Sequence, residues 1–411
     1  MKKPTLALVS TYKVECGIAS YAEVIESELK NHFEARVFPL PPSYFKAPSG
    51  DAAKIADSII DDICKELPKF DVVNLQLEPG IFGSNPKIIF KRLKKLINAS
   101  PRVILTLHTI CYKTSSSFTK DFIKTLLKRP RSIRNLISRN QWVNLFTKLF
   151  DFLQKTKPSS YYIIAHTKRE ADNIAATFGI KNIIDTPLSL LSRENIDAAI
   201  NDSNSRVRLI RNYHLQDTDI LIGVFGFITP YKGIETVIKA LDFLPTNHKL
   251  MLFGAVHPNS IQPTQATNKY VLKLLKLTER FNAAERAGDR VMFCGKTTDK
   301  EFVEAMNACD FVILPYLETA QTSSGPTSMA LELKKKIVTT NNHFFNEVAK
   351  YAKNCFLQFD IGNHLQLAQK IKYFPQDEII NQSLIDYNTQ FNLEKRAIIY
   401  HQCWEKLSKI N

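Results

Sequence analysis

Short apolar runs alternate with amphipathic segments along nearly the whole chain, and this alternation is the strongest constraint on its fold. The first series of predicted strands comprises 6–10, 36–40, 71–76, 102–108 and 161–166. The second series comprises 220–227, 249–253, 290–293, 311–314 and 337–340. The amphipathic segments between the runs predict helices. Such alternation is typical of α/β folds, in which helices cover both faces of a parallel sheet.

A weak, polar stretch at 192–205 separates the two series and predicts a domain boundary. We expect two Rossmann-like, doubly wound domains, one over 1–195 and one over 206–389, with 390–411 packing back on the first. In such sheets, ligands bind beyond the carboxyl ends of the strands. Because we expect the two domains to face each other, the expected site is the cleft between them.

Composition and charge limit the classes of protein and partner. Apolar residues make up 44% of the chain, which supports substantial cores and is not typical of disorder. No apolar run is long enough to predict a transmembrane helix, and the N-terminal run is too short for a signal peptide. The formal charge of +15 suits nucleic acid, anionic lipid or phosphorylated substrates, and charge alone does not choose among them. Since no RNP, helix-turn-helix or zinc-finger pattern occurs, we expect no nucleic-acid partner.

Several catalytic and metal motifs are missing from the sequence. The seven cysteines include no C-x-x-C pair, which argues against a metal site and favours a reducing, cytoplasmic compartment. There is no G-x-S-x-G, H-E-x-x-H, P-loop or dinucleotide fingerprint, so dehydrogenase and kinase chemistry are disfavoured. Asp61 and Asp62 lie inside a predicted helix, and no acidic pair follows a predicted strand. We therefore expect no metal ion and no cofactor.

The stretch 221–240, LIGVFGFITPYKGIETVIKA, indicates most about function. An apolar strand leads into a turn with Pro230, and Lys232-Gly233 then opens an amphipathic helix. A lysine and free N–H groups at the positive end of a helix suit a phosphate group. We expect this lysine at the protein surface. The alternative is an ordinary α/β unit whose lysine is merely solvated.

A second anion-binding candidate lies after the predicted strand 311–314. There Ser323, Ser324 and Gly325 stand at the start of a predicted helix, where hydroxyl groups and N–H donors would gather. Serine is also an ordinary helix-capping residue, and simple capping is the alternative. Two such candidates after strands of one domain favour the phosphate interpretation.

Three further candidate sites follow strands of the first series. Cys16-Gly17 would form a tight turn before a helix, where backbone can approach a phosphate or a sugar. His108 ends the run VILTL, so it could bond a hydroxyl group or carry a proton. His166 has the same placement after YYIIA. The alternatives are a plain turn for Cys16-Gly17, a structural histidine for His108 and a helix-capping residue for His166.

Four landmarks in order resemble the GT-B fold retaining glycosyltransferases of the large family four. They are S-x-Y-x-x-x-C-G-I-A-x-Y-A, LTLHTI, GFITPYKGIETVIKAL and VMFCGKTTDKEFVEAMNACDFVILPY. The third is similar to the family's G-R-x-x-P-x-K-G donor segment. The resemblance covers nearly the whole chain. It implies metal-independent transfer of a sugar, with retention, from a nucleotide sugar such as a GDP- or UDP-sugar to a glycan, lipid-linked or polysaccharide-precursor acceptor.

The resemblance also implies roles for individual residues. Lys232 would hold the donor's diphosphate, and the backbone at Cys16 and Gly17 would approach it. His108 would contact the transferred sugar. Residues Cys294, Gly295 and Lys296 would lie near the base. The phosphate and ribose would meet Ser323, Ser324, Gly325, Pro326 and Thr327.

Two positions depart from the family pattern. Phe227 replaces the arginine that precedes the lysine, so one positive charge near the diphosphate is missing. The E-x7-E pair falls at Gln321 and Met329, of which Gln321 can still bond a sugar hydroxyl and Met329 cannot bind ribose. We therefore place Gln321 with His108 and Lys232 among the catalytic candidates. The departures keep open a non-catalytic module that binds a sugar nucleotide or a partner.

The segment 111–157 is basic and interrupted, and its later part, 136–153, places apolar and aromatic residues at helical spacing. Such a segment could lie on an anionic membrane surface, with apolar residues inserted and cations at the head groups. That interpretation predicts a cytoplasmic protein, peripheral on the inner face of the membrane. The alternative is a helical excursion that packs on its own domain.

Overall fold

The chain forms two compact units with one parallel sheet each. The computed structural model describes residues 2–110, 130–157, 159–256, 268–282, 289–318, 322–375 and 378–409, and for 130–140 it describes the backbone alone. Unit 1 consists of Met1–Leu190 and Leu393–Asn411, and unit 2 consists of Leu191–Asn392.

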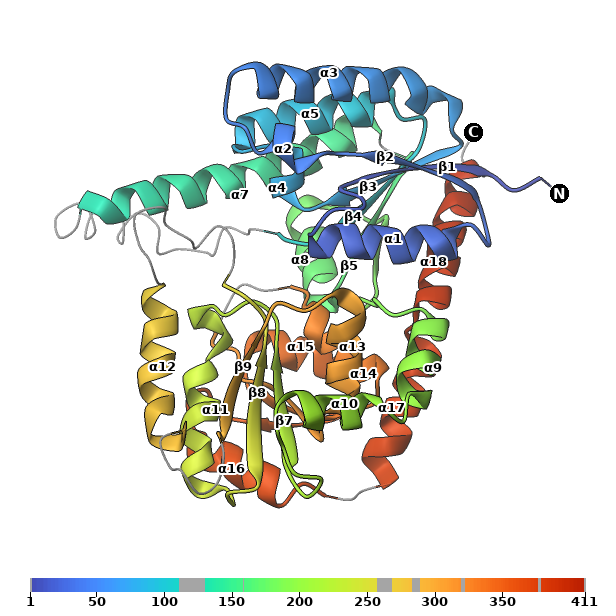
Figure 1. Cartoon of the computed structure of the whole chain (residues 1–411). Helices are drawn as coiled ribbons and strands as arrows, with labels where there is room; N and C mark the ends of the chain where they lie inside the picture. Colours follow the sequence, from blue (N-terminus) through green and yellow to red (C-terminus); the bar gives the residue numbers. More distant parts are fainter. Residues whose placement is uncertain are drawn as a thin grey trace. The chain divides into compact units, whose positions relative to one another are not determined.

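The sheet of unit 1 has six strands in the order β2-β1-β3-β4-β5-β6, and neighbouring strands run parallel. Its strands are β1 (Thr5–Ser10), β2 (Glu34–Pro39), β3 (Val72–Leu77), β4 (Val103–Leu107), β5 (Tyr161–Ala165) and β6 (Ile183–Asp185). Its helices are α1 (Gly17–Leu29), α2 (Pro42–Phe45), α3 (Asp51–Glu66), α4 (Pro79–Phe82), α5 (Pro86–Ala99), α7 (Pro130–Thr156), α8 (Lys168–Phe178) and α18 (Leu393–Ser408). Helices α3 and α5 lie on one side of this sheet and α1 and α18 on the other (Figure 1).

Unit 2 repeats this plan with the strand order β12-β11-β10-β7-β8-β9, again with parallel neighbours. Its strands are β7 (Ile220–Phe225), β8 (His248–Phe253), β9 (Val291–Gly295), β10 (Phe311–Leu314), β11 (Lys336–Thr340) and β12 (Phe356–Phe359). Its helices are α9 (Arg193–Asn201), α10 (Ser205–Asn212), α11 (Ile234–Ala240), α12 (Lys269–Asn282), α13 (Asp299–Ala308), α14 (Gly325–Glu332), α15 (His343–Tyr351), α16 (His364–Lys372) and α17 (Glu378–Gln390).

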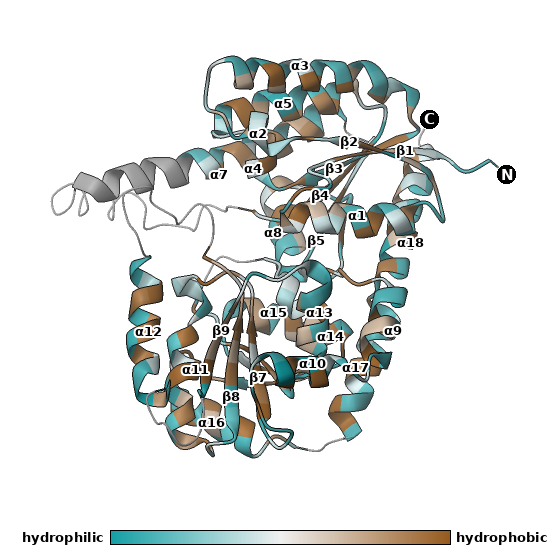
Figure 2. Cartoon of the chain, in the orientation of Figure 1, coloured by the Kyte–Doolittle hydropathy of each residue, from teal (hydrophilic) through white to brown (hydrophobic). Residues whose placement is uncertain are grey.

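The central strands are apolar on both faces because helices cover both. Along β7, Leu221 and Phe225 pack into one core and Ile222 and Val224 into the other. Successive side chains of a strand point to opposite faces, so an unbroken apolar run is what a strand between two helical layers requires. Figure 2 shows hydrophobic residues concentrated on the strands, while the helices are mixed. The predicted α/β class with two Rossmann-like, doubly wound domains is confirmed.

The segment between the two predicted series differs from the expected polar boundary. Residues 193–201 form α9, which packs into unit 2 through Ile196 and Ala199. Unit 2 therefore begins at Leu191 rather than at residue 206, and its end lies at Asn392. The last helix, α18, contacts α1 and is part of unit 1.

The later part of the basic segment 111–157 packs inside unit 1. On α7, Leu145, Phe146, Leu149, Phe150 and Leu153 are buried in the core of this unit. The expectation that the apolar residues of this part insert into a membrane is therefore wrong for residues 141–153, because the same residues cover the sheet. In the described part of the chain, no helix has the length and apolar character needed to cross a membrane.

Candidate functional site

The sheet of unit 2 has its topological switch point beside β7. The chain passes from β7 to β8 on one side, while β10 pairs with β7 on the other. At such a point the loops that follow the two central strands leave in opposite directions, and the crevice between them is where ligands bind in doubly wound sheets. The loop after β7 carries Lys232, and the loop after β10 leads to Ser324.

The turn after β7 is held against the end of β10. The backbone N–H of Leu317 donates to the carbonyl of Tyr231 over 2.8 Å. Gly233 has a φ of +62°, and a Cβ there would lie 2.1 Å from the carbonyl oxygen of Pro315. Only glycine fits both this left-handed conformation and this close approach. The turn therefore fixes where Lys232 lies.

Lys232 is buried rather than at the surface, which corrects the expectation from sequence. Its side chain is only 3% exposed, and its Nζ donates to the hydroxyl of Tyr316 over 2.5 Å. The Tyr316 hydroxyl in turn lies 3.0 Å from the Oγ of Ser324. The Ser324 Oγ accepts from the backbone N–H of Thr327 and so caps α14. Lysine, tyrosine, serine and a helix N-terminus thus form one connected cluster.

The cluster is electropositive. Burial lowers the pKa of Lys232 to about 8, and no carboxylate of the described residues acts on its ammonium group. The first turn of α14 carries no acidic residue, so the partial positive charge of this helix end is not offset there. Gly226 lies against the cluster, since a Cβ at that position would be 3.4 Å from both Lys232 Nζ and Pro326 Cγ. A buried cation beside a helix N-terminus is an arrangement that favours an anion.

The remaining predicted residues of unit 2 lie around this cluster or apart from it. Ser323, Gly325 and Pro326 belong to the start of α14 or precede it directly. Phe227 is 47% exposed. Residues Cys294, Gly295 and Lys296 lie at the end of β9, which β8 separates from β7. Gln321 lies outside the described residues.

Three other side chains near α14 have structural contacts. Met329 packs against the core of unit 2. Glu332 is buried and accepts from the backbone N–H of Leu191 over 3.1 Å. Glu318 accepts from the backbone N–H of His343. Each of these three side chains therefore has a packing or hydrogen-bonding role within unit 2.

In unit 1 the switch point lies beside β1, which pairs with β2 and β3. Cys16 is the N-cap residue of α1, and its side chain makes no capping bond. A Cβ on Gly17 would meet no atom within 4 Å, so packing within the protein does not require glycine there. The buried hydroxyls of Ser10 and Thr11, at the end of β1, have no hydrogen-bond partner in the described part.

His108 is buried in a polar network of unit 1. Its Nε2 lies 2.7 Å from Gln76 Oε1, and its Nδ1 lies 3.3 Å from the Nε2 of His166. Burial, with a smaller effect of Arg396, lowers the pKa of His108 to about 3. Both ring nitrogens of His108 already have partners, Gln76 and His166. A sugar could therefore bond to a ring nitrogen only by replacing one of these two contacts. His166 does not cap α8, because Thr167 does.

Sequence reasoning missed Tyr316, Arg396 and Glu78. Tyr316 gave no signal beyond its place after β10. Arg396 is remote in sequence from the histidines that it approaches. Glu78 follows β3 and accepts from the hydroxyl of Thr109 over 2.6 Å, and burial raises the pKa of its carboxyl group. The position of Glu78 at a strand's carboxyl end was the available signal.

Comparisons with known proteins agree with the architecture. Residues 205–391 match the model of the family described as glycosyl transferases group 1. No curated protein matches the chain in sequence.

Solved structures match over the whole chain. HepE from Anabaena, solved in complex with UDP and glucose, has a TM-score of 0.64 at 16% identity, with 99% of this chain and 100% of that chain covered. A glycosyltransferase from Rickettsia africae has a TM-score of 0.65 at 12% identity, with 99% and 100% covered. Sucrose-phosphate synthase from Thermosynechococcus elongatus has a TM-score of 0.64 at 12% identity, with 100% of both chains covered. At these identities the likeness shows the fold, which is GT-B.

Proposed function

We propose that the chain is a member of the glycosyl transferases group 1 family, whose model matches residues 205–391. In this proposal it transfers a hexose from a nucleotide sugar to an acceptor hydroxyl, with retention and without a metal ion. The observation that carries the proposal is the cluster of Lys232, Tyr316 and Ser324 at the N-terminus of α14. Its buried ammonium group has no carboxylate partner among the described residues, and it lies where a doubly wound sheet binds ligands.

The chemistry of the proposed reaction needs such a cluster. When the bond between the sugar and the diphosphate breaks, negative charge builds on the departing diphosphate and positive charge on the sugar. A fixed cation and backbone N–H groups stabilise that developing charge with little reorganisation. Lys232 and the first turn of α14 would provide this stabilisation, so the leaving group needs no metal. Among the described residues, no group of His, Cys, Asp and Glu has the arrangement of a metal site.

The other predicted roles stay proposals. Residues 323–327 would bind phosphate and ribose, and Cys294, Gly295 and Lys296 would lie near the base. The backbone at Cys16-Gly17 would approach the diphosphate, and Gln321 would bond a sugar hydroxyl. The structure of HepE with UDP and glucose makes a UDP-sugar the first donor to test. A glycan or a lipid-linked compound remains the proposed acceptor.

His108 would contact the transferred sugar under this proposal. We expect His108→Ala to impair sugar transfer more than it impairs binding of the nucleoside diphosphate alone. Parallel kinetic and calorimetric measurements on the variant check this, and an equal loss of both would indicate a purely structural histidine.

A non-catalytic module that binds a sugar nucleotide is the second candidate, and two observations favour it. Phe227 is exposed where the family pattern has arginine, so the diphosphate would meet one cation fewer. Met329 packs against the core of unit 2, at a position where the family pattern has a ribose-binding glutamate. The first departure would remove one cation from the departing diphosphate, and the second would remove a hydrogen bond to the ribose.

One experiment separates the two candidates. The full chain is mixed with a panel of UDP- and GDP-sugars, and both the shift in melting temperature and the release of nucleoside diphosphate are measured. A glycosyltransferase releases nucleoside diphosphate from at least one donor, faster when an acceptor is present. A stabilising shift without release supports the binding module, and neither effect with any donor would contradict both candidates.

A further inference from the structure

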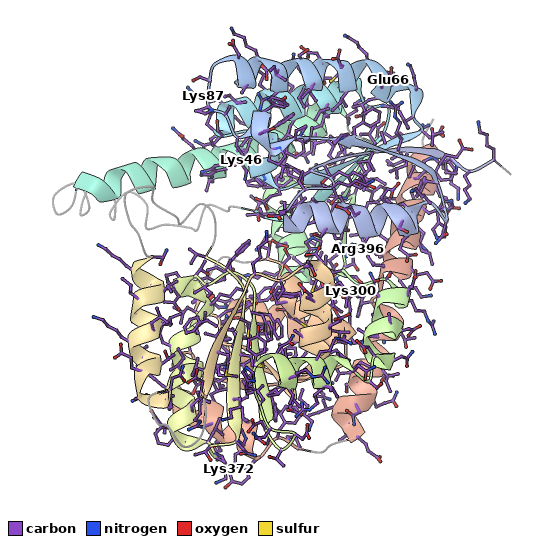
Figure 3. The ribbon with its side chains drawn as sticks, in the orientation of Figure 1. Lys46, Glu66, Lys87, Lys300, Lys372 and Arg396 are labelled. Carbon is purple, nitrogen blue, oxygen red and sulfur yellow. The ribbon has the colours of Figure 1, made fainter. Side chains whose placement is uncertain are left out.

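A line of buried polar side chains crosses unit 1 from the carboxyl ends of β5 and β4 to the middle of β3. It begins at Arg396 on α18, which Figure 3 labels. Arg396 Nη2 lies 2.9 Å from His166 Nδ1, and His166 Nε2 lies 3.3 Å from His108 Nδ1. His108 Nε2 lies 2.7 Å from Gln76 Oε1. All four side chains are buried.

The line continues from Gln76 to the backbone of β4. Gln76 Nε2 donates to Asn74 Oδ1 over 2.6 Å. Asn74 Nδ2 donates to the carbonyl oxygen of Ile104 over 2.9 Å and to Thr106 Oγ1 over 3.1 Å. One branch of the line therefore ends at a backbone carbonyl, while the other continues from Thr106 Oγ1 to the hydroxyl of Tyr400 over 2.6 Å.

The direction of every hydrogen bond in this line follows from the Arg396 end. A guanidinium group only donates, so His166 Nδ1 must accept. A neutral His166 then carries its proton on Nε2 and donates to His108 Nδ1. His108 in turn carries its proton on Nε2 and donates to Gln76.

The opposite end gives the same result independently. A carbonyl oxygen only accepts, so the Asn74 amide must turn its nitrogen toward Ile104. Its oxygen then accepts from Gln76, and this leaves Gln76 Oε1 facing His108. That oxygen requires a proton on His108 Nε2, which is the tautomer inferred from Arg396.

We infer that Arg396 is a positioning residue, which fixes His166 and His108 as neutral Nε2–H tautomers and so prevents His108 from acting as an acid or a base in sugar transfer. The tautomers do not depend on the proposed function, whereas the consequence for transfer rests on it. His108 then serves the reaction only as a neutral, rigidly oriented ring. The last helix of the chain thereby sets the state of a residue that follows β4.

The surroundings of the two rings agree with a neutral pair. Burial, and then the charges of Arg396 and His108, lower the pKa of His166, although a hydrogen bond with the backbone of Thr186 acts in the opposite direction. Burial and then Arg396 also lower the pKa of His108. Tyr21 on α1 stacks edge-on to His108 at 5.0 Å, and its hydroxyl accepts from Arg396 Nε over 2.7 Å. Tyr400 on α18 lies near Gln76 and Tyr21. Arg396 also donates to the carbonyl of Pro187 over 2.6 Å, so its position does not depend on the histidines.

The first test reads the tautomers directly. The full chain is labelled with 15N in histidine, and long-range 1H–15N spectra are recorded from pH 5 to pH 9, with signals assigned through His108→Ala and His166→Ala. We expect both rings to keep a neutral pattern with the proton on Nε2 across this range. The chain unfolded in urea serves as the control, because its histidines titrate near their ordinary pKa. A change of charge in either ring, or a proton on Nδ1, would overturn the inference.

The second test asks whether Arg396 acts through His108. Arg396→Met removes the donor and keeps much of the side chain's volume, and Lys395→Met on the same helix is the charge-matched control with an exposed side chain. We expect Arg396→Met to lose the single tautomer of His166 and to lower kcat at least tenfold, with UDP affinity unchanged within twofold. In a His108→Ala background, the same change should lower kcat by less than twofold.

A merely structural arginine predicts other results. The losses from Arg396→Met and His108→Ala would then multiply, and the histidine spectra of Arg396→Met would match those of the original chain. Either outcome would overturn the inference. If Arg396→Met fails to fold, Arg396→Lys replaces it, because lysine keeps a cationic donor. We expect Arg396→Lys to retain the His166 tautomer, and loss of that tautomer would count against the inference. If no nucleotide sugar is turned over, the proposed transfer fails, while the spectra still decide the tautomers.

Discussion

Lys232 shows how a single buried side chain can indicate a ligand. An ammonium group taken out of water needs compensation, and here a phenol hydroxyl and two aromatic rings provide it in place of a carboxylate. Tyr316 is itself fixed, since its carbonyl oxygen accepts from Thr340 Oγ1 over 2.6 Å and from Asn342 Nδ2 over 3.2 Å. The cation is therefore held in place without being neutralised, which leaves its charge available to an anion.

We expect Lys232→Met to lower turnover at least tenfold, which corresponds to about 1.4 kcal/mol of lost transition-state stabilisation. The melting temperature should stay equal or rise, because the change removes a buried charge and keeps an apolar stem of similar length. Steady-state kinetics and thermal unfolding check both parts. Lys239→Met removes an exposed lysine of the following helix and is the matched control. Full activity of the Lys232 variant would contradict the donor-site assignment.

The lowered pKa of Lys232 predicts a pH dependence of donor binding. In the free protein the ammonium form predominates below a pKa of about 8 and is lost as the pH rises through it. Affinity for UDP should therefore fall above that pH, by up to about tenfold per pH unit if binding requires the charge. Calorimetric titration with UDP between pH 7 and pH 9.5 measures this dependence. Lys232→Met should bind weakly without this slope, and the same slope in both proteins would assign the effect to another group.

At the residue level, sequence could place side chains that follow strands but not their contacts. Lys232 was identified because a strand, a turn and a helix start are local features. Its partner Tyr316 is 84 residues away, and Arg396 is 230 residues from His166. Contacts over such separations depend on strand order, which an apolar pattern does not specify. Burial of Lys232 was missed for the same reason.

At the level of elements, the long buried strands could be predicted and the short edge strands could not. A strand that lies between two helical layers has an unbroken apolar sequence, which predicts a buried strand. An example is β4, whose sequence VILTL is buried throughout. The edge strands β6 and β12 have three and four residues and are mostly half-buried, so their sequences lack that pattern. Helix α9 was hidden in a polar stretch, because it buries only a few side chains such as Ala199.

The turn between β7 and α11 is the element on which the candidate site depends most. We expect Gly233→Ala to lower the free energy of unfolding by more than about 1 kcal/mol, because a Cβ would enter the left-handed region and lie 2.1 Å from the Pro315 carbonyl oxygen. Chemical denaturation measures the change. Gly362→Ala is the control, since Gly362 also has a positive φ but a Cβ there would meet no atom within 4 Å. If both variants lose the same free energy of unfolding, the cost comes from the left-handed backbone conformation alone. The close approach of Gly233 to the Pro315 carbonyl would then contribute nothing.

For the whole molecule, the candidate donor site accounts for little of the net charge of +15. The proposed donor is anionic, but one buried lysine uses little of this excess. The basic segment 111–157 remains a candidate for the rest, although the buried apolar side chains of its later part are unavailable to a membrane. Any attraction to anionic lipid would therefore be electrostatic and would come from the earlier part of the segment, whose side chains lie outside the described residues.

Binding to vesicles rich in anionic lipid tests that attraction. We expect binding at low salt that weakens at high salt, because screening shortens the range of surface charges. One variant replaces four cations of the segment with glutamine: Lys128, Arg129, Arg131 and Arg134. The control variant replaces four exposed lysines labelled in Figure 3: Lys46, Lys87, Lys300 and Lys372.

Both variants lose the same formal charge, so the comparison separates a local basic surface from net charge. If the segment is the binding surface, the first variant loses vesicle binding and keeps its affinity for UDP, while the control binds vesicles nearly as the original chain does. Equal losses would show that total charge alone attracts the protein, which is no evidence for a lipid-linked acceptor. If the original chain ignores anionic vesicles even at low salt, the membrane hypothesis is wrong. A soluble glycan would then be the acceptor to test, since the candidate donor site does not depend on the segment.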